Sequence, residues 1–210
     1  DCMINGDTST SHQDTLSTWN IRGRWGSSGL GGSNDHRKCF DGFRRKAFAL
    51  GGTYASAGTG TLTLAELIAE IAKMGEMAVS NRILICSPEF MVNQLMNLDE
   101  LQTVDKFGDR AVVIQGQIAA LLGIPVVMSR FMSADLESSG KYTGGGGTKC
   151  GFLLVNRDSY NIYNRRGILV ETSKDVAAGA IELVSTMRAV MATPESSTSP
   201  NVVYNYDFTS

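Results

Sequence analysis

The sequence has little charge of either sign. Of its 210 residues, 19 are Lys or Arg and 21 are Asp or Glu, which gives a net charge of −2 and a pI of about 5.7. This balance argues against a histone-like or polybasic DNA-binding protein. At 42% hydrophobic, the chain is nevertheless too apolar for intrinsic disorder. A chain of this length buries roughly 70% of its unfolded surface, so we expect a sizeable core.

Long hydrophobic runs are also missing. The longest nearly apolar run, from Ile118 to Met128, is interrupted by Gly123 and Pro125. A transmembrane helix needs about 20 apolar residues, so the sequence predicts no spanning segment and no membrane partner. The first residues, from Asp1, lack the basic region of a signal peptide, and we interpret the chain as a piece of a longer protein.

The few cysteines and histidines do not form a metal-binding pattern. The cysteines stand at positions 2, 39, 86 and 150, without CxxC or metal-finger spacing, and free thiols in a reducing cytoplasm are favoured. Only His12 and His36 are present. His36 and Cys39 offer two ligands, and no second pair completes a tetrahedral set. We therefore predict no metal site and no cofactor.

Two motifs suggest catalysis, and neither meets its chemical requirements. Gly144 to Gly147 precede Thr148-Lys149, whereas a phosphate-binding loop needs Gly directly before the Lys and Ser or Thr after it. Cys86 ends a predicted strand just before a helix N-terminus, a position that lowers a thiol pKa, but no convincing basic partner is evident. A buried apolar role for Cys86 is favoured, and we predict no catalytic residues and no enzyme activity.

The first predicted helix follows a long Gly-rich loop from Asn20 to Asn34. Asp35 is its expected N-cap and Gly51-Gly52 its stop. Its apolar stripe consists of His36, Phe40, Phe43, Ala47 and Leu50. Basic residues cover much of the remaining surface: Arg37, Lys38, Arg44, Arg45 and Lys46. We favour the interpretation that these side chains form a solvated helix face. The alternative is that they contact phosphate groups.

Two further helices have clear start signals. Thr63 and Glu66 fit a capping box, followed by an apolar stripe of Leu64, Leu67, Ile68, Ile71, Met74 and Ala78. Ser87 is the expected N-cap of the next helix, with Pro88 at its first position. Met91, Leu95 and Leu98 are expected on the buried side of that helix.

The remaining chain predicts mainly strands. Short strands are expected at Arg82–Cys86, Ala111–Ile114, Ile124–Ser129, Phe152–Val155 and Tyr204–Phe208. Of these, Arg82–Cys86, Ile124–Ser129 and Phe152–Val155 are expected to be buried, while the last alternates with Asn205 and Asp207. Tyr160–Asn164 and Ile168–Glu171 suggest a hairpin that turns at Arg165-Arg166-Gly167, and Phe131–Lys149 a long loop. Ile181–Met191 alternates like a strand with one wet face, although periodicity alone does not exclude a helix. This order of elements predicts an α+β fold.

Several motifs, in order along the chain, resemble the major capsid protein of tailed double-stranded-DNA bacteriophages, the Hong Kong 97-like family. The most telling is Leu122 to Ser129 (LGIPVVMS), which is similar to the family's Gly-x-Pro-Val-Val strand. The other matching segments are Asn5–Asp7, Asp41–Arg44, Arg82–Phe90, Asn156–Ile162, Arg165–Ile168, Arg188 and Thr193–Ser196.

The resemblance implies an axial domain with a mixed sheet flanked by helices, plus part of a peripheral domain. Residues 1–60 would belong to the peripheral domain with its Gly-rich loop, residues 61–192 to the axial domain, and residues 193–210 to a return strand. The family's N-terminal arm, extended loop and spine helix are not recognised here. We therefore expect this 210-residue chain to run as a monomer or weak oligomer rather than close a shell.

The implied function is structural. Copies of the complete protein would assemble as hexamers and pentamers into the icosahedral head, formed in the host bacterial cytoplasm, that encloses double-stranded DNA without sequence specificity. Scaffold, portal or decoration proteins are further partners of this class. Two alternatives stay open: an encapsulin-like protein-cage subunit of the same fold and, more distantly, a small α/β enzyme that uses Cys86 or the Gly144 loop.

Overall fold

The structure, a computed structural model, describes residues 2–6, 40–55, 60–78, 81–98, 101–102, 119–141, 147–175, 179–193 and 200–210. Its α-helices are α1 (Cys2–Asn5), α2 (Phe43–Ala49), α3 (Leu64–Met74) and α4 (Pro88–Asn93). Short 3₁₀ turns follow at Gly75–Ala78, Leu95–Asn97 and Arg157–Ser159. The strands are β1 (Thr53–Ala55), β2 (Arg82–Cys86), β3 (Leu101–Gln102), β4 (Ala119–Leu121), β5 (Ile124–Met128), β6 (Lys149–Asn156), β7 (Asn161–Asp175), β8 (Ala180–Ala192) and β9 (Val202–Thr209).

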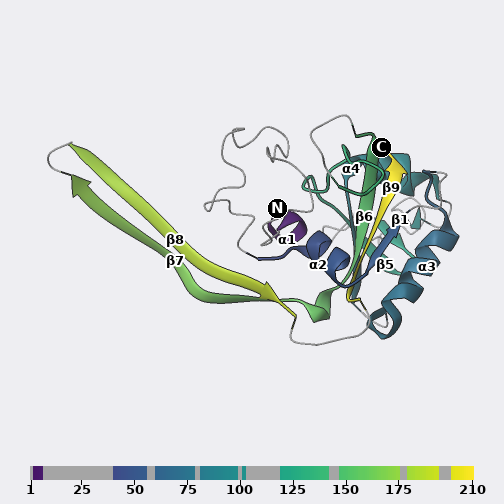
Figure 1. Cartoon of the computed structure of the whole chain (residues 1–210), viewed down its shortest axis with the longest axis horizontal. Coiled ribbons are helices and arrows are strands. Elements are labelled where there is room, and N and C mark those ends of the chain that lie inside the picture. Colours follow the sequence, from purple (N-terminus) through teal and green to yellow (C-terminus); the bar gives the residue numbers. More distant parts are fainter. Residues whose placement is uncertain are drawn as a thin grey trace.

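Seven strands form one mixed sheet, in the order β1-β9-β6-β2-β5-β4-β3, and β7 and β8 form a separate two-stranded sheet. The β1–β9 and β2–β5 pairs are parallel, while the other pairs in the large sheet are antiparallel. Helices together with a mixed sheet confirm the α+β class predicted from the sequence. Figure 1 shows α1 and α2 on one side of the large sheet and α3 on the other.

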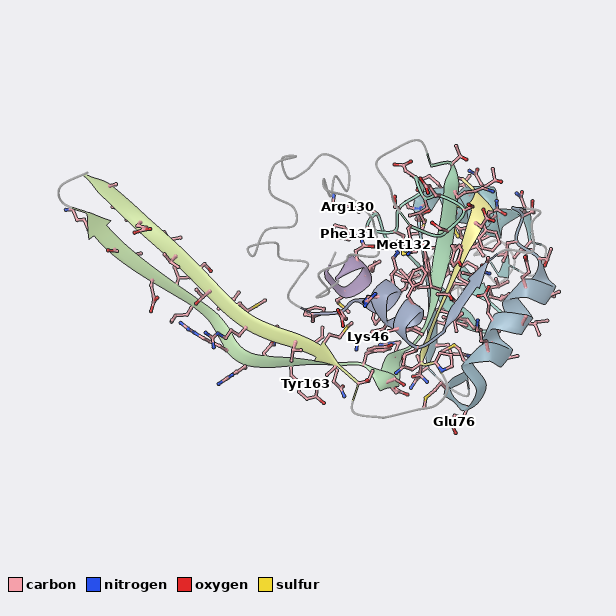
Figure 2. The ribbon with its side chains drawn as sticks, in the orientation of Figure 1. Lys46, Glu76, Arg130, Phe131, Met132 and Tyr163 are labelled. Atoms are coloured by element: carbon pink, nitrogen blue, oxygen red, sulfur yellow. The ribbon has the colours of Figure 1, made fainter. Side chains whose placement is uncertain are left out.

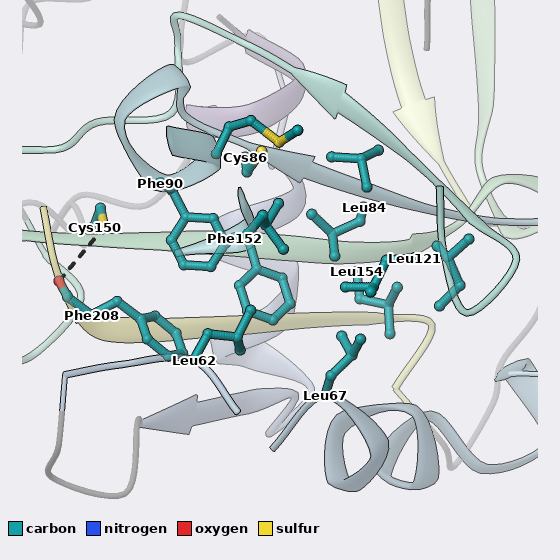
Figure 3. Close-up of a cluster of buried hydrophobic side chains, with 14 of the residues drawn as sticks. Leu62, Leu67, Leu84, Cys86, Phe90, Leu121, Cys150, Phe152, Leu154 and Phe208 are labelled. Atoms are coloured by element: carbon teal, nitrogen blue, oxygen red, sulfur yellow. Dashed lines mark hydrogen bonds between the residues drawn. The ribbon is translucent and has the colours of Figure 1, made fainter. Parts of the chain in front are cut away.

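The core lies on both faces of this sheet, and β6 contributes to both because its side chains alternate. Phe152 and Leu154 face the side of α3 and α4, where Phe90 and Phe208 complete an aromatic group with ring centroids 5.1 to 5.9 Å apart (Figure 3). Leu153 and Val155 belong to the core on the α1 and α2 side. A strand that is buried on both faces has a continuous run of apolar residues in the sequence. For this reason the buried strand at Phe152–Val155 was predicted correctly.

The capping box at the start of α3 is confirmed. The Thr63 backbone N–H donates to Glu66 Oε2 at 2.9 Å, and the Glu66 N–H donates to Thr63 Oγ1 at 3.3 Å. Leu67 and Met74 from the predicted stripe are fully buried, whereas Ile68 is exposed.

Thr63→Ala should lower the free energy of unfolding by about 1 kcal/mol, because it removes one of these two reciprocal hydrogen bonds. Thermal or urea unfolding measures the change. The exposed substitution Ala72→Ser, later in the same helix, is the control for an effect of helix propensity alone. A Thr63→Ala variant as stable as wild type would contradict the cap.

The β2–α4 prediction is confirmed as well. Ser87 Oγ accepts a hydrogen bond from the Phe90 N–H at 3.1 Å, and Pro88 occupies the first turn of α4. The predicted strand at Ile124–Ser129 is β5, and Pro125 lies at its second residue, near the strand start, as expected. Leu122 and Gly123 both have positive φ, and they form the tight turn that joins β4 to β5.

The predicted start of the first helix is wrong. The helix α2 begins at Phe43 with Gly42 as its N-cap, and residues 40–42 are not helical. Its end is correct, since Gly51 adopts a φ of +67° directly after the C-cap Leu50. The apolar spacing of Phe40 reflects packing against the core beside α2 rather than a turn of that helix.

The predicted hairpin at residues 160–171 is also wrong. Arg165-Arg166-Gly167 does not turn; β7 continues through it to Asp175, with register irregularities between Asn164 and Arg166 and between Arg166 and Leu169. Those irregularities absorb extra residues without reversing the chain. The chain reverses between Asp175 and Ala180, where Gly179 has positive φ.

Several predictions fall outside the described residues: Asp35, His36, the loop from Asn20 to Asn34, the strand at Ala111–Ile114 and most of the Gly144 loop. The division of the chain at residues 60 and 192 stays a prediction; the large sheet takes strands from all three of the segments so defined. None of the helices in the described ranges is long and apolar enough to cross a membrane.

Candidate assembly surface

The most distinctive surface of the molecule is the hairpin of β7 and β8. Figure 1 shows it extending far beyond the body formed by the large sheet and its helices. The two strands pair along their whole length, from Asn161 opposite Ala192 to Asp175 opposite Ala180. Side chains project from both strands of this ribbon (Figure 2), and most of those on β8 are exposed.

The base of the hairpin is fixed firmly to the body. Tyr160 donates its hydroxyl hydrogen bond to Asn201 Oδ1 at 2.5 Å, and its ring meets the edge of Phe43 with centroids 5.0 Å apart. Burial raises the pKa of the Tyr160 phenol, so it remains a donor at neutral pH. Met191, near the end of β8, is buried in the core on the α2 side.

One face of the hairpin is largely apolar and exposed, although Lys174, opposite Ile181, also lies on it toward the tip. Alternate residues of a strand share a face, and so do residues directly opposite one another across an antiparallel pair. By this rule Val170, Ile181, Leu183 and Met187 share one face, and they are 54%, 73%, 65% and 61% exposed. We call these four residues the apolar face.

This exposure corrects the prediction of a single wet face on Ile181–Met191. The segment is a strand, β8, as expected, but its apolar side faces away from the core until Met191. An isolated two-stranded hairpin is marginally stable in water. Contiguous exposed apolar surface usually marks a site that another molecule covers. The apolar face therefore has the properties of a contact surface.

Cys86 lies in the core on the α3 and α4 side of the sheet. Its side chain is fully buried, and burial, with a smaller effect from Cys150, raises the pKa of its thiol to about 12. The predicted lowering by the α4 N-terminus is outweighed by this desolvation. Cys86 and Cys150 are both free thiols, as predicted, while the side chains of Cys2 and Cys39 lie outside the described residues.

The basic side chains of α2 are not uniformly solvated. Arg44 is buried, donates to Asn5 Oδ1 at 2.9 Å and to the Gly140 carbonyl at 2.8 Å, and lies over the Tyr204 ring. It thus joins α1, α2, a loop and β9. Lys46 is half-buried, and this burial lowers its pKa, although Asp41 opposes the shift. Arg37 and Lys38 lie outside the described residues.

Lys149 also has a structural role. It begins β6, where Lys149 Nζ lies 3.2 Å from Asp207 Oδ1. The segment that follows the Gly144 loop is the strand β6, and a strand was predicted there at Phe152–Val155. Within the described parts of the chain, no group of three or more His, Cys, Asp or Glu residues is placed to hold a metal ion.

A buried polar pair was missed by the sequence analysis. Glu70 on α3 and Asn205 on β9 are both fully buried, and Asn205 Nδ2 donates to Glu70 Oε1. Burial first, and Glu66 second, raise the pKa of the Glu70 carboxyl well above its ordinary value, while Lys73 opposes the shift. Glu70 occupies an apparently polar position of an amphipathic helix, and its partner lies 135 residues away, so no local pattern indicates the pair.

Comparison with known proteins gives only distant likenesses. No family model and no curated protein matches the sequence. Solved structures similar to the chain include the bacteriophage PhiM1 mature capsid (14% identity, TM-score 0.45), Mycobacterium phage Che8 (17%, 0.46) and the capsid of an empty GTA particle (12%, 0.44).

The matches cover 73%, 77% and 75% of this chain and 50%, 57% and 50% of those chains, in the same order. The chain thus spans about half the length of the structures it resembles. Likenesses at this level carry no functional argument, and the function must be inferred from the chain's own surfaces.

Proposed function

We propose that this chain is part of a structural capsid protein, whose copies assemble as hexamers and pentamers into an icosahedral shell around phage double-stranded DNA. The observation that carries the proposal is the apolar face, Val170, Ile181, Leu183 and Met187, held in water on a hairpin anchored to the body. Such a surface is costly for a monomer and is useful to a subunit that copies of itself cover.

Other features support the same function. The sequence motifs that resemble the Hong Kong 97-like family run from Asn5 to Ser196, over nearly the whole chain. The buried, protonated Cys86 removes the main support for an enzyme. A mild negative charge keeps the shell from trapping DNA through non-specific phosphate contacts. An encapsulin-like cage of the same fold would present an equivalent surface and differs in its cargo.

Electron microscopy of the complete natural protein, expressed in bacteria, tests the proposal. Closed shells are expected from the wild type, and DNA-filled shells in a phage lysate would distinguish a head from an enzyme cage. The variant Ile181→Thr with Leu183→Thr should stay folded, because Thr suits strands, yet reduce shell formation at least about tenfold by removing apolar contact area.

The control is Val92→Thr, which makes the same kind of apolar-to-Thr change, on a smaller scale, at an exposed position of α4. It should assemble like the wild type. If the complete protein stays a soluble monomer under all conditions, the proposed function is wrong. If the double variant assembles normally, the hairpin is not the contact that drives assembly.

A further inference from the structure

The opposite face of the hairpin carries a charge pattern that complements itself. β8 is regular from Glu182 to Arg188, so these two side chains share a face with Thr186. Arg166 lies directly opposite Arg188, and Glu171 lies opposite Val184, which places both on that same face. We call Arg166, Glu171, Glu182 and Arg188 the charged face.

The charges are separated along this face. The two arginines lie on the side of the hairpin's base and the two glutamates toward its tip. Arg188 and Glu182 are six residues apart, a separation of about 20 Å along an extended strand. Between them the face is less polar, with Leu169, Val184 and Thr186. The face is therefore basic at one end, acidic at the other and largely apolar at its centre.

These charges are not paired with one another or with any other residue that the structure describes. In the described part of the molecule, none of the four side chains forms an ion pair or hydrogen bond with another residue. Arg166 and Arg188 are directly opposite in register, and like charges in that position destabilise an antiparallel pair. Negative charge from another molecule would relieve this repulsion.

We propose that the charged face binds the charged face of a second copy of this chain, with the two hairpins antiparallel about a two-fold axis. In this arrangement Arg166 and Arg188 of each copy meet Glu171 and Glu182 of the other. The axis passes near Val184 and Thr186, so the apolar centres also meet. A two-fold interface requires such a self-complementary patch, and this face supplies one.

The inference rests on the proposed self-assembly and adds to it which face pairs, in which orientation and through which charges. The contact is small and exposed, so it is weak and sensitive to salt, as small charged interfaces are. Its main contribution is to fix orientation and register, while the apolar face remains available for a different neighbour.

Charge reversal tests this pairing in the full 210-residue chain. Variant one, Arg166→Glu with Arg188→Glu, has an entirely acidic face, and variant two, Glu171→Arg with Glu182→Arg, an entirely basic one. Sedimentation velocity at low ionic strength should show weak self-association of the wild type. Each variant alone should self-associate at least about tenfold more weakly than the wild type. An equimolar mixture of the two variants should form a one-to-one complex.

The control Arg130→Glu with Arg157→Glu makes the same change in net charge on exposed positions of the body, and it should leave association as in the wild type. Circular dichroism and thermal unfolding confirm that each variant is folded. A mixture of folded variants that fails to pair overturns the inference. If the variants do not fold, sedimentation of the wild type alone tests the inference. A wild type that shows no salt-sensitive association at low ionic strength also overturns the inference.

The two proposals fail separately. If the complete protein forms normal shells when it carries variant one, and also when it carries variant two, the pairing is contradicted and the capsid function stays intact. A mixture that pairs as expected, from a complete protein that never forms shells, supports the pairing and contradicts the capsid function.

Discussion

Val126→Asp is expected to abolish soluble folding of the chain. Val126 is fully buried in β5, between Leu84 on β2 and Ala119 on β4, and it belongs to the core on the α3 and α4 side. A carboxylate there has no partner, and burying an unpaired charge or forcing its protonation costs several kcal/mol. Domains of this size have only about 5–15 kcal/mol of stability in total.

Soluble expression and circular dichroism measure the effect of this substitution. The control is Met128→Asp, two residues later in the same strand, where the side chain is exposed and the carboxylate remains hydrated. Met128→Asp should fold with a modest loss of stability. A Val126→Asp protein with a cooperative unfolding transition like that of the wild type would show that this face of β5 is not in the core.

Glu70→Gln is expected to remove a fall in stability with rising pH that begins above about pH 4.5. In the folded protein, burial and Glu66 raise the pKa of Glu70 well above 4.5, its ordinary value and the value expected in the unfolded chain. Above pH 4.5 the unfolded chain therefore loses a proton that the folded chain keeps. The free energy of unfolding should fall with rising pH, by at most about 1.4 kcal/mol per pH unit, until the folded pKa is passed.

Glutamine keeps the shape and the acceptor that Asn205 Nδ2 uses, but it cannot ionise. Urea unfolding at several pH values should give the wild type a declining stability and Glu70→Gln a nearly flat one. Glu76→Gln, at an exposed position just after α3, is the control and should keep the wild-type slope. Equal slopes for wild type and Glu70→Gln would mean that Glu70 ionises normally in the fold.

The sequence determined those elements whose signals are local. The capping box of Thr63 and Glu66, the Ser87-Pro88 start of α4 and the continuous apolar run of β6 each act through neighbours in the chain. Hydrogen bonds within one turn and side-chain alternation within one strand need no distant partner. These segments were therefore predicted correctly, together with the α+β class that their order implies.

Only the tertiary structure decided which polar and apolar side chains are buried. Glu70 and Arg44 look like surface residues of amphipathic helices, and they are buried because Asn205, Asn5 and the Gly140 carbonyl are brought to them from elsewhere in the chain. Ile181 and Leu183 look like core residues, and they are exposed because, among the described strands, β7 pairs with β8 alone and the hairpin leaves the body. An alternating pattern indicates that the apolar face of a strand becomes covered. It does not indicate whether the covering surface belongs to the same chain or to another copy.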